Sequence, residues 1–406
     1  MPSEAVRTGP LAGLRVLEIS GLLGEYAGKL LADHGADVVL VEPPSGAPRR
    51  RLGPFVDGEP GPERSLSFAY YNTNKRSVTL DLDTGEGRAA FLRLAARSDV
   101  VLDGTGEPGH LEGRGLGHDV RARGNPKLVS TIVTPFGADG PLADYASTDL
   151  ILMAMGGLLS LGGYADGVPV RGHGDQAWLA AGQFAAVGTM LAVLQADTTG
   201  SGQVVDVSAQ EAVVMAHENA VQWYDLEHVV RRRNGGAARQ AAVGVYPCQD
   251  GHVYLLAKGL GVFWDELVAL LESEDVEGAA SLREPKWKDD DFAASEAGKA
   301  EFETIFGRLA LRRTKAQLYE AAKRVRIPLC PINTPADLVA SPHLAARDYF
   351  VDVDHPATGR TLRMPGAPFK MTGSPIGVPR PAPRLGEHNA ELLGTDALTT
   401  TGTGAN

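Results

Sequence analysis

Short apolar runs alternate with amphipathic segments through the first half of the chain. Residues 14–19 and 36–41 are apolar runs of strand length, and residues 22–34 between them carry a helical spacing that stops at Gly35. This order is that of a βαβ unit. The alternation continues with an extended stretch from Lys75, a helix over 85–97, and strands over 99–102, 127–133 and 203–208. The pattern predicts an α/β fold in which helices wrap a parallel sheet.

The long uncharged run over residues 177–194 is rich in Ala and Gly. It is barely long enough to span a bilayer, and Gln183 lies in its middle. We therefore expect a buried core helix and no membrane partner. A further helix is predicted over residues 209–224.

The pattern of apolar and charged residues changes from Gly244 onward. Residues 244–257 have the pattern of a hairpin, and charged amphipathic helices follow over 263–272 and 301–311. We expect these segments to form a second domain. A strand-like stretch opens at Ile327, and the Pro-rich residues 367–384 predict an irregular path before a short terminal helix.

The composition sets bounds on the function. With 406 residues, 43% of them hydrophobic, the chain exceeds what one core usually serves and predicts two globular domains. A formal net charge of −11 argues against a nucleic-acid partner. Cys248 and Cys330 are too few for a disulfide framework, and no His or Cys spacing suggests a metal site. Because the amino terminus also lacks the pattern of a secretory signal, we expect a cytoplasmic protein.

The Gly174-Asp175 step is the main candidate for chemistry. It places a carboxylate immediately before the apolar helix, whose N–H groups and positive dipole end would keep that carboxylate ionised and fixed in direction. This arrangement suits a nucleophile. It equally suits an ordinary N-cap, because Asp is a favoured capping residue.

The first βαβ unit also invites a dinucleotide interpretation. Glycines stand at positions 21, 24 and 28, and the acidic Glu42 follows the second strand. The glycine spacing is not G-x-G-x-x-G, so the sequence argues against a nicotinamide cofactor.

Six segments together resemble the family III coenzyme A transferases, the group of formyl-CoA and crotonobetainyl-CoA:carnitine transferases. They are LAGLRVLEIS, HGADVVLVEPP, NTNKRSVTLDLDTGEGR, GSGQVVDVS, GAPFKMTGSP and APRLGEHNAELL, in this order and over almost the whole chain. The resemblance implies a Rossmann-like large domain formed by both chain ends, over residues 1–220 and 328–406, and a smaller inserted α+β domain over 221–327. It also implies a homodimer whose two chains interlock, which would account for the long irregular connections.

The resemblance assigns the chemistry to Asp175. It implies that this carboxylate attacks an acyl-CoA thioester, that an aspartyl-CoA thioester follows, and that CoA then passes to a small carboxylic acid. Coenzyme A is thus expected as part of the substrate, with no metal. The Asn234-Gly235-Gly236 segment lies near where relatives have a glycine-containing loop over the active site. Its alternative is a plain interdomain hinge.

Asp149 matches an acidic position of the family and is a second candidate catalytic residue. It would position substrate or tune Asp175 by like-charge repulsion. Alternatively, it caps the apolar helix that follows it. A racemase of the same family is the competing activity, but its histidine would precede the acidic residue, where this chain has Thr148. Threonine cannot exchange protons in this way.

Two segments depart from the family pattern. Glu25 follows Gly24 where relatives have proline, and the loop expected to contact CoA reads Gly-Thr-Gly-Glu-Pro-Gly over residues 104–109. Acidic side chains facing a polyphosphate would be unfavourable. These changes leave open a repurposed member with another acyl carrier. The resemblance suggests, as residues that flank the CoA groove, the cations Arg49, Arg50, Arg51, Lys75, Arg76 and Arg114, together with Thr105 of the altered loop.

Overall fold

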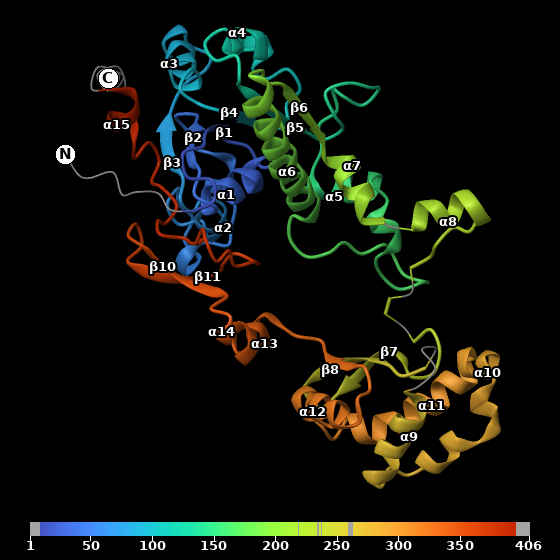
Figure 1. Ribbon diagram of the computed structural model, residues 1–406. Coiled ribbons are helices and arrows are strands. Elements are labelled where there is room, and N and C mark those ends of the chain that lie inside the picture. The colour runs from blue at the N-terminus through green and yellow to red at the C-terminus, as the bar shows by residue number, and fades with distance from the viewer. Residues whose placement is uncertain (1–8, 218, 234, 237, 259–262, 395–406) are drawn as a thin grey trace. The chain divides into compact units, whose positions relative to one another are not determined.

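The computed structural model describes residues 9–217, 219–233, 235–236, 238–258 and 263–394. The chain forms two compact units (Figure 1). The first comprises Met1–Ser160, Arg171–Arg231 and His343–Asn406, and the second comprises Leu161–Val170 and Arg232–Pro342. Both chain ends therefore belong to the first unit.

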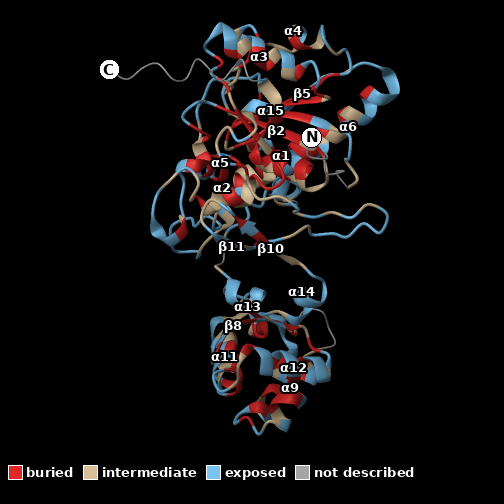
Figure 2. Ribbon diagram, turned by 90° about the vertical axis from the view of Figure 1, so that its left-hand side faces the viewer, coloured by how far each residue is buried: buried red, intermediate tan, exposed pale blue. Residues whose placement is uncertain are grey.

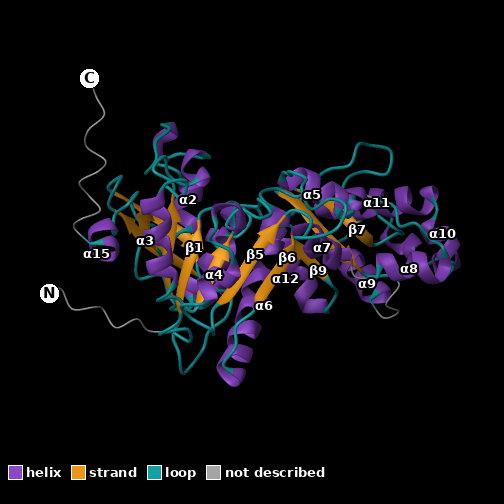
Figure 3. Ribbon diagram, turned by 90° about the horizontal axis from the view of Figure 1, so that it is seen from above, coloured by secondary structure: helices purple, strands orange, loops and turns teal. Residues whose placement is uncertain are grey.

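A six-stranded parallel sheet is the framework of the first unit. Its strands are β1 (Arg15–Ile19), β2 (Asp37–Glu42), β3 (Arg76–Thr79), β4 (Val100–Asp103), β5 (Val129–Thr134) and β6 (Val204–Ser208). They lie side by side in the order β3-β2-β1-β4-β5-β6, with all six labelled in Figure 1, and Figure 3 shows the strands from above. This is the doubly wound order, with a reversal between β1 and β4, and it confirms the predicted parallel α/β fold.

Helices cover both faces because successive residues of each strand point to opposite sides. Val16 and Val38 pack in a core with α1 (Glu25–Asp33) and α6 (Gln176–Thr199). Leu17 and Val39, one residue further along, pack in a separate core with α3 (Gly85–Ala95). The labelled strands β2 and β5 are accordingly buried in Figure 2. Runs buried on both faces explain why the strands read as continuous apolar segments.

Helix α6 is the predicted long apolar helix. Among the described helices it alone is long and apolar enough to cross a membrane by length and composition, and 39% of its most apolar 18-residue window is buried. One face packs on α1, where Gly182 is required because a Cβ atom there would lie 2.8 Å from Cβ of Tyr26. The other face carries apolar side chains that this single chain leaves exposed: Phe184, Val187, Leu191 and Leu194.

The remaining elements of this part of the chain are short. The predicted helix over 209–224 is broken into α7 (Ala209–Val214), a 3₁₀ turn at Met215–His217, and α8 (Ala220–Glu227). The Pro-rich tail leads to the expected terminal helix, α15 (Asn389–Leu393). The others are α2 (Leu66–Tyr71), α4 (His118–Ala122), α5 (Asp149–Met155), α14 (Pro342–Ala346) and the antiparallel pair β10 (Phe350–His355) and β11 (Arg360–Pro365).

The second unit has its own core. The predicted hairpin is β7 (Val243–Cys248) with β8 (Gly251–Leu256), and β9 (Leu329–Pro331) pairs with β8. Tyr246 of β7 packs edge to face against Phe302 and Phe306 in this core. The helices are α9 (Trp264–Ser273), α10 (Asp290–Ala294), α11 (Glu296–Ala310), α12 (Lys315–Val325) and α13 (Pro335–Val339).

Candidate active site

Asp175 stands at the N-cap position of α6, but its side chain does not cap the helix. Gly174 has φ +81°, a left-handed conformation that glycine adopts without strain and that turns the chain into the helix. The Asp175 carboxylate instead turns aside, and its Oδ2 lies 2.9 Å from Nη1 of Arg49. The side chain is 28% exposed, so it combines a buried partner with access from outside. The alternative of an ordinary capping side chain is therefore wrong.

Asp149 supplies the missing cap from another helix. Its Oδ1 accepts hydrogen bonds from the backbone N–H groups of Ala177 (2.8 Å) and Trp178 (3.3 Å) at the start of α6. Its own helix, α5, is capped by the Thr148 hydroxyl, which accepts from the N–H of Ile151. The alternative that Asp149 caps the helix directly after it is thus wrong, because Asp149 caps α6.

The two carboxylates share one helix terminus. Burial raises the pKa of Asp149, the two amide hydrogen bonds oppose that shift, and the negative charge of Asp175 adds to it. Oδ2 of Asp149 has no hydrogen-bond partner among the described residues, and its nearest cation is Arg171 at 3.7 Å. The carboxylate of Asp175 thus acts on Asp149, while the tuning of Asp175 by Asp149 stays a prediction.

Arg49 is the buried centre of the site. It lies in a 3₁₀ turn, Pro48–Arg51, and is 2% exposed. Its Nη1 donates to Asp175 and, at 2.8 Å, to Oγ of Ser67. Its Nε donates to Oε2 of Glu25, and its guanidinium lies 4.1 Å from the centroid of the Tyr71 ring. The position of this guanidinium is therefore fixed on several sides.

Glu25 belongs to the site, a role that the sequence reasoning missed. It lies in the first turn of α1 and is 3% exposed, and its Oε1 also accepts from Nδ2 of Asn72 at 2.5 Å. The acid therefore does not face an open groove, because both its oxygens are occupied inside the protein. No local sequence signal identifies this role, because the contact joins residues 24 positions apart.

Besides Arg49, two more of the predicted CoA-binding cations are buried and paired. Arg50 donates to Glu42 through Nε (2.6 Å) and Nη2 (2.8 Å). The Lys75 ammonium lies 2.8 Å from Glu18. Their side chains are 1% and 0% exposed, so neither is a solvated surface residue. Glu42, the acidic residue of the dinucleotide interpretation, is paired with Arg50 as well.

The other predicted cofactor-binding residues lie nearer the surface. Arg76 pairs with Asp37 (2.5 Å) and Glu391 (2.6 Å). Thr105 donates through its hydroxyl to Asp103 at 2.7 Å. Arg114 Nε donates to Asp83 at 2.9 Å. Of the predicted site residues, the structure brings Asp175 into contact with Arg49, and places Asp149 at the same helix terminus.

Two further predicted features stand apart from this cluster. Glu107 of the altered loop is an exposed residue paired with His110 at 2.9 Å. Asn234 lies outside the described residues, and its neighbours Gly235 and Gly236 belong to the second unit. Within the described ranges, no group of three or more His, Cys, Asp or Glu side chains could hold a metal ion.

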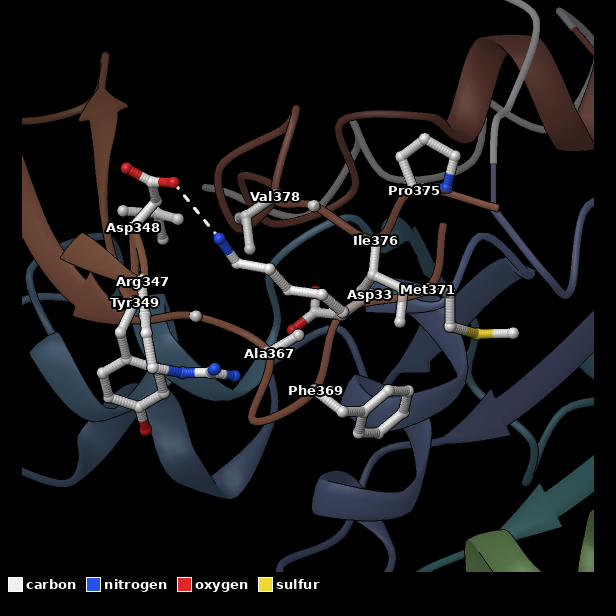
Figure 4. A pocket seen from close by; sticks show the side chains of 14 residues that line it. Asp33, Arg347, Asp348, Tyr349, Ala367, Phe369, Met371, Pro375, Ile376 and Val378 are labelled. Atoms are coloured by element: carbon white, nitrogen blue, oxygen red, sulfur yellow. Dashed lines mark hydrogen bonds and ion pairs between the residues drawn. The ribbon is translucent and has the colours of Figure 1, made fainter. Parts of the chain in front are cut away.

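A cavity of about 290 Å³ lies elsewhere in the first unit (Figure 4). Tyr349 and Phe369 form part of its wall, and Lys370 pairs across it with Asp348 at 3.2 Å. Its lining contains none of the predicted site residues. The Asp175 cluster therefore remains the candidate active site.

Comparison with known proteins decides the family. The profile of CoA-transferase family III matches residues 11–389. The chain belongs to this family. As a family III CoA-transferase, it is 40% identical over 381 residues to succinyl-CoA:(R)-benzylsuccinate CoA-transferase subunit BbsE of Thauera aromatica, covering 93% of this chain and 92% of the relative.

Other similar proteins agree with this assignment. The succinyl-CoA–D-citramalate CoA-transferase of Chloroflexus aurantiacus is 33% identical over 400 residues, which cover 96% of this chain and 94% of the relative. The crystal structure of a CAIB/BAIF family protein from Brucella suis superposes on this family III CoA-transferase with a TM-score of 0.81 at 27% identity, covering 95% and 99% of the two chains.

Proposed function

We propose that this chain transfers CoA from succinyl-CoA to a second dicarboxylic acid, with Asp175 as the covalent nucleophile. The observation that carries the proposal is that the two carboxylates at the start of α6 have different partners. Asp149 takes the helix N–H groups, which leaves the partly exposed carboxylate of Asp175 available to an incoming thioester. The two curated relatives compared above are named for succinyl-CoA and for acids that carry two carboxylates.

The reaction proceeds through four balanced steps. The Asp175 carboxylate attacks the thioester carbonyl, the C–S bond breaks, and a mixed anhydride and CoA thiolate form. The thiolate attacks the aspartyl carbonyl, which releases succinate and leaves an aspartyl-CoA thioester. The acceptor carboxylate attacks that thioester and expels the thiolate as a second anhydride forms. The thiolate then attacks the acceptor acyl group, which yields the new thioester and restores the Asp175 carboxylate.

We propose that the polyphosphate of CoA is contacted by Thr105 and Arg114, whose side chains lie nearer the surface than those of the other predicted residues. Arg50 and Lys75 support the site indirectly, because their buried pairs fix the segments that carry Arg49 and Asn72. Arg76 holds the sheet edge through Asp37.

We also propose a cytoplasmic homodimer with a Rossmann-like large domain. Exposed apolar side chains on one face of α6 support an interface, since monomers seldom leave such a stripe uncovered. The Thauera relative is named as a subunit, so light scattering of the purified chain is the direct measurement. Twice the chain mass is expected, whereas a monomer that assembles only with a second, different chain would contradict the homodimer.

The test of the function is a trapping experiment. The protein is mixed with succinyl-CoA and quenched with hydroxylamine, and the peptide containing residue 175 is analysed by mass spectrometry. A hydroxamate on Asp175 that requires the thioester is expected, and Asp175→Asn serves as the control. CoA binding without an adduct, combined with exchange of the α-proton, would instead indicate the racemase activity.

A further inference from the structure

We propose that Arg49 is the positioning residue for Asp175. We further propose that Glu25 is the permanent counterion of Arg49 and balances the charge of Arg49 while Asp175 is acylated. The proposal rests on the proposed function, because it concerns the covalent state of Asp175. It assigns to the chain a fixed three-residue array of acid, cation and acid. Neither Glu25 nor Arg49 is required to react.

The geometry selects one oxygen of the nucleophile. Arg49 engages Oδ2 of Asp175 at 2.9 Å, and none of the described residues donates a hydrogen bond to Oδ1. Arg49 cannot swing away easily, because Ser67, Glu25 and the Tyr71 ring hold its guanidinium. Because the buried guanidinium holds Oδ2 of the carboxylate, the Oδ1 atom points in a defined direction. This orientation favours attack on a bound thioester.

The charges explain why a second acid is present. Before reaction, Glu25, Arg49 and Asp175 carry a net charge of −1. Acylation removes the charge of Asp175 and leaves the neutral pair of Glu25 and Arg49. Without Glu25, the same step would leave the 2%-exposed guanidinium of Arg49 as a buried cation without a counterion, a state that proteins tolerate poorly.

Glu25 itself is secured by a neutral donor. Nδ2 of Asn72 donates to Oε1 of Glu25, so this oxygen stays satisfied in every state of Asp175. The Lys75 ammonium donates to the backbone oxygen of Glu25 at 3.1 Å and to Oε1 of Glu18 at 2.8 Å, and neither bond engages the Glu25 carboxylate. Glu25 is therefore available as the counterion of Arg49.

No other ionisable group nearby replaces Glu25. Burial raises the pKa of Tyr71 to about 12 and Arg49 opposes the shift, so the phenol is neutral at pH 7. Asp149 is bound to the amides of α6, and Arg171 beside it is a cation. The counterion role thus falls on Glu25 alone among the charged groups described around Arg49.

The first experiment compares Glu25→Gln with Glu25→Asp. Glu25→Gln keeps the size of the side chain and removes the charge, so the single-turnover rate of Asp175 acylation is expected to fall by about tenfold or more. The KM for succinyl-CoA is expected to change less than kcat, because the lost interaction matters after attack. Glu25→Asp retains the charge and should restore much of the rate, which a merely structural role of the side chain would not produce.

The second experiment is a double-mutant cycle. Removing cation and counterion together in Glu25→Gln/Arg49→Gln should cost less than the product of the two single losses, since no buried charge is then left alone. Strictly multiplicative losses would overturn the coupling. The same holds if Glu25→Gln acylates Asp175 at the wild-type rate.

A third readout is independent of catalysis. Carbodiimide with glycinamide labels accessible carboxyl groups, and labelling of Asp175 at one fixed pH is followed by peptide mass without any acyl-CoA. Arg49→Gln should label several times faster and Glu25→Gln more slowly than wild type, because Arg49 then pairs with Asp175 alone. Unchanged labelling in both variants would refute the array. Wild-type protein could give no hydroxamate while the labelling rates of the two variants change as expected. The proposed function would then be wrong, and the arrangement of Glu25, Arg49 and Asp175 would still be supported.

Discussion

Asp149 Oδ1 lies 2.8 Å from the backbone nitrogen of Ala177, so a side chain on α5 caps the N-terminus of α6. Residue 175 occupies the capping position yet contributes no cap. A helix terminus normally takes its cap from the adjoining residue. Here Asp149 caps the helix instead, and the carboxylate of Asp175 pairs with Arg49.

This relationship predicts different effects for two substitutions of Asp149. Asp149→Asn retains the acceptor oxygen and should leave the stability of the first unit nearly unchanged. Asp149→Ala exposes buried amides of α6 and should lower the free energy of unfolding by about 1–2 kcal/mol. Urea denaturation followed by circular dichroism measures both. Equal stability of the Ala and wild-type proteins would contradict the capping role.

The close approach of α1 and α6 predicts that Gly182 cannot be enlarged without cost. An alanine Cβ would lie 2.8 Å from Tyr26 Cβ and 3.1 Å from the nitrogen of Ala27, so the helices must separate. We expect Gly182→Ala to lower the free energy of unfolding by about 1–3 kcal/mol. Gly85→Ala, at the start of α3 with nothing within 4 Å of the added atom, is the control. Its stability should stay the same or rise slightly, and an equal loss in both variants would argue against the packing explanation.

Substitutions of two predicted CoA-binding arginines should affect different properties, stability for Arg50 and CoA affinity for Arg114. Arg50→Ala leaves Glu42 as a buried carboxylate without its cation, which typically costs about 3–5 kcal/mol. Arg114→Ala removes a partly exposed pair with Asp83, for which about 0–1 kcal/mol is usual. Thermal unfolding compares the stabilities, and calorimetric titration with CoA tests Arg114. Loss of CoA affinity in folded Arg114→Ala is expected, and full affinity would remove Arg114 from the cofactor site.

Much of the sheet could be predicted because its strands are buried on both faces. The apolar runs at β1, β2 and β4 follow directly from that burial. The pair β10 and β11 is absent from the prediction, although Val351, Asp352 and Val353 show the period-2 alternation of a strand with one exposed face. Its ladder depends on cross-strand partners such as Asp352 and Arg363, which pairing of the strands brings together.

The candidate site could be predicted only as far as local signals reach. Asp175 was a candidate because a carboxylate precedes an apolar helix, a signal contained in adjacent residues, and the family resemblance then assigned the chemistry to it. Glu25 lies 24 positions from Arg49, and Arg49 lies 126 positions from Asp175. Which cations point inward depends on the burial of their segments, so sequence alone could not separate the buried Arg50 from the more exposed Arg114.

The buried carboxyl of Glu18 predicts a specific pH dependence of stability. Burial raises its pKa from 4.5 to about 7, and the attraction of Lys75 opposes the shift. In the unfolded chain the group has its ordinary pKa, so between pH 4.5 and about 7 the folded state binds more protons than the unfolded state. The contribution of Glu18 to stability is therefore complete below pH 4.5 and is lost as the pH rises through about 7.

Urea denaturation of wild type and Glu18→Gln across this range tests the dependence. Glu18→Gln mimics the protonated acid and lacks the titration, so the stability of wild type relative to this variant should fall steadily from pH 4.5 to pH 7. Glu59→Gln, an exposed position 73% accessible at its side chain, is the matched control and should parallel wild type. If the Glu18→Gln and wild-type curves ran parallel instead, the carboxyl would titrate alike in both states, and burial would not raise its pKa.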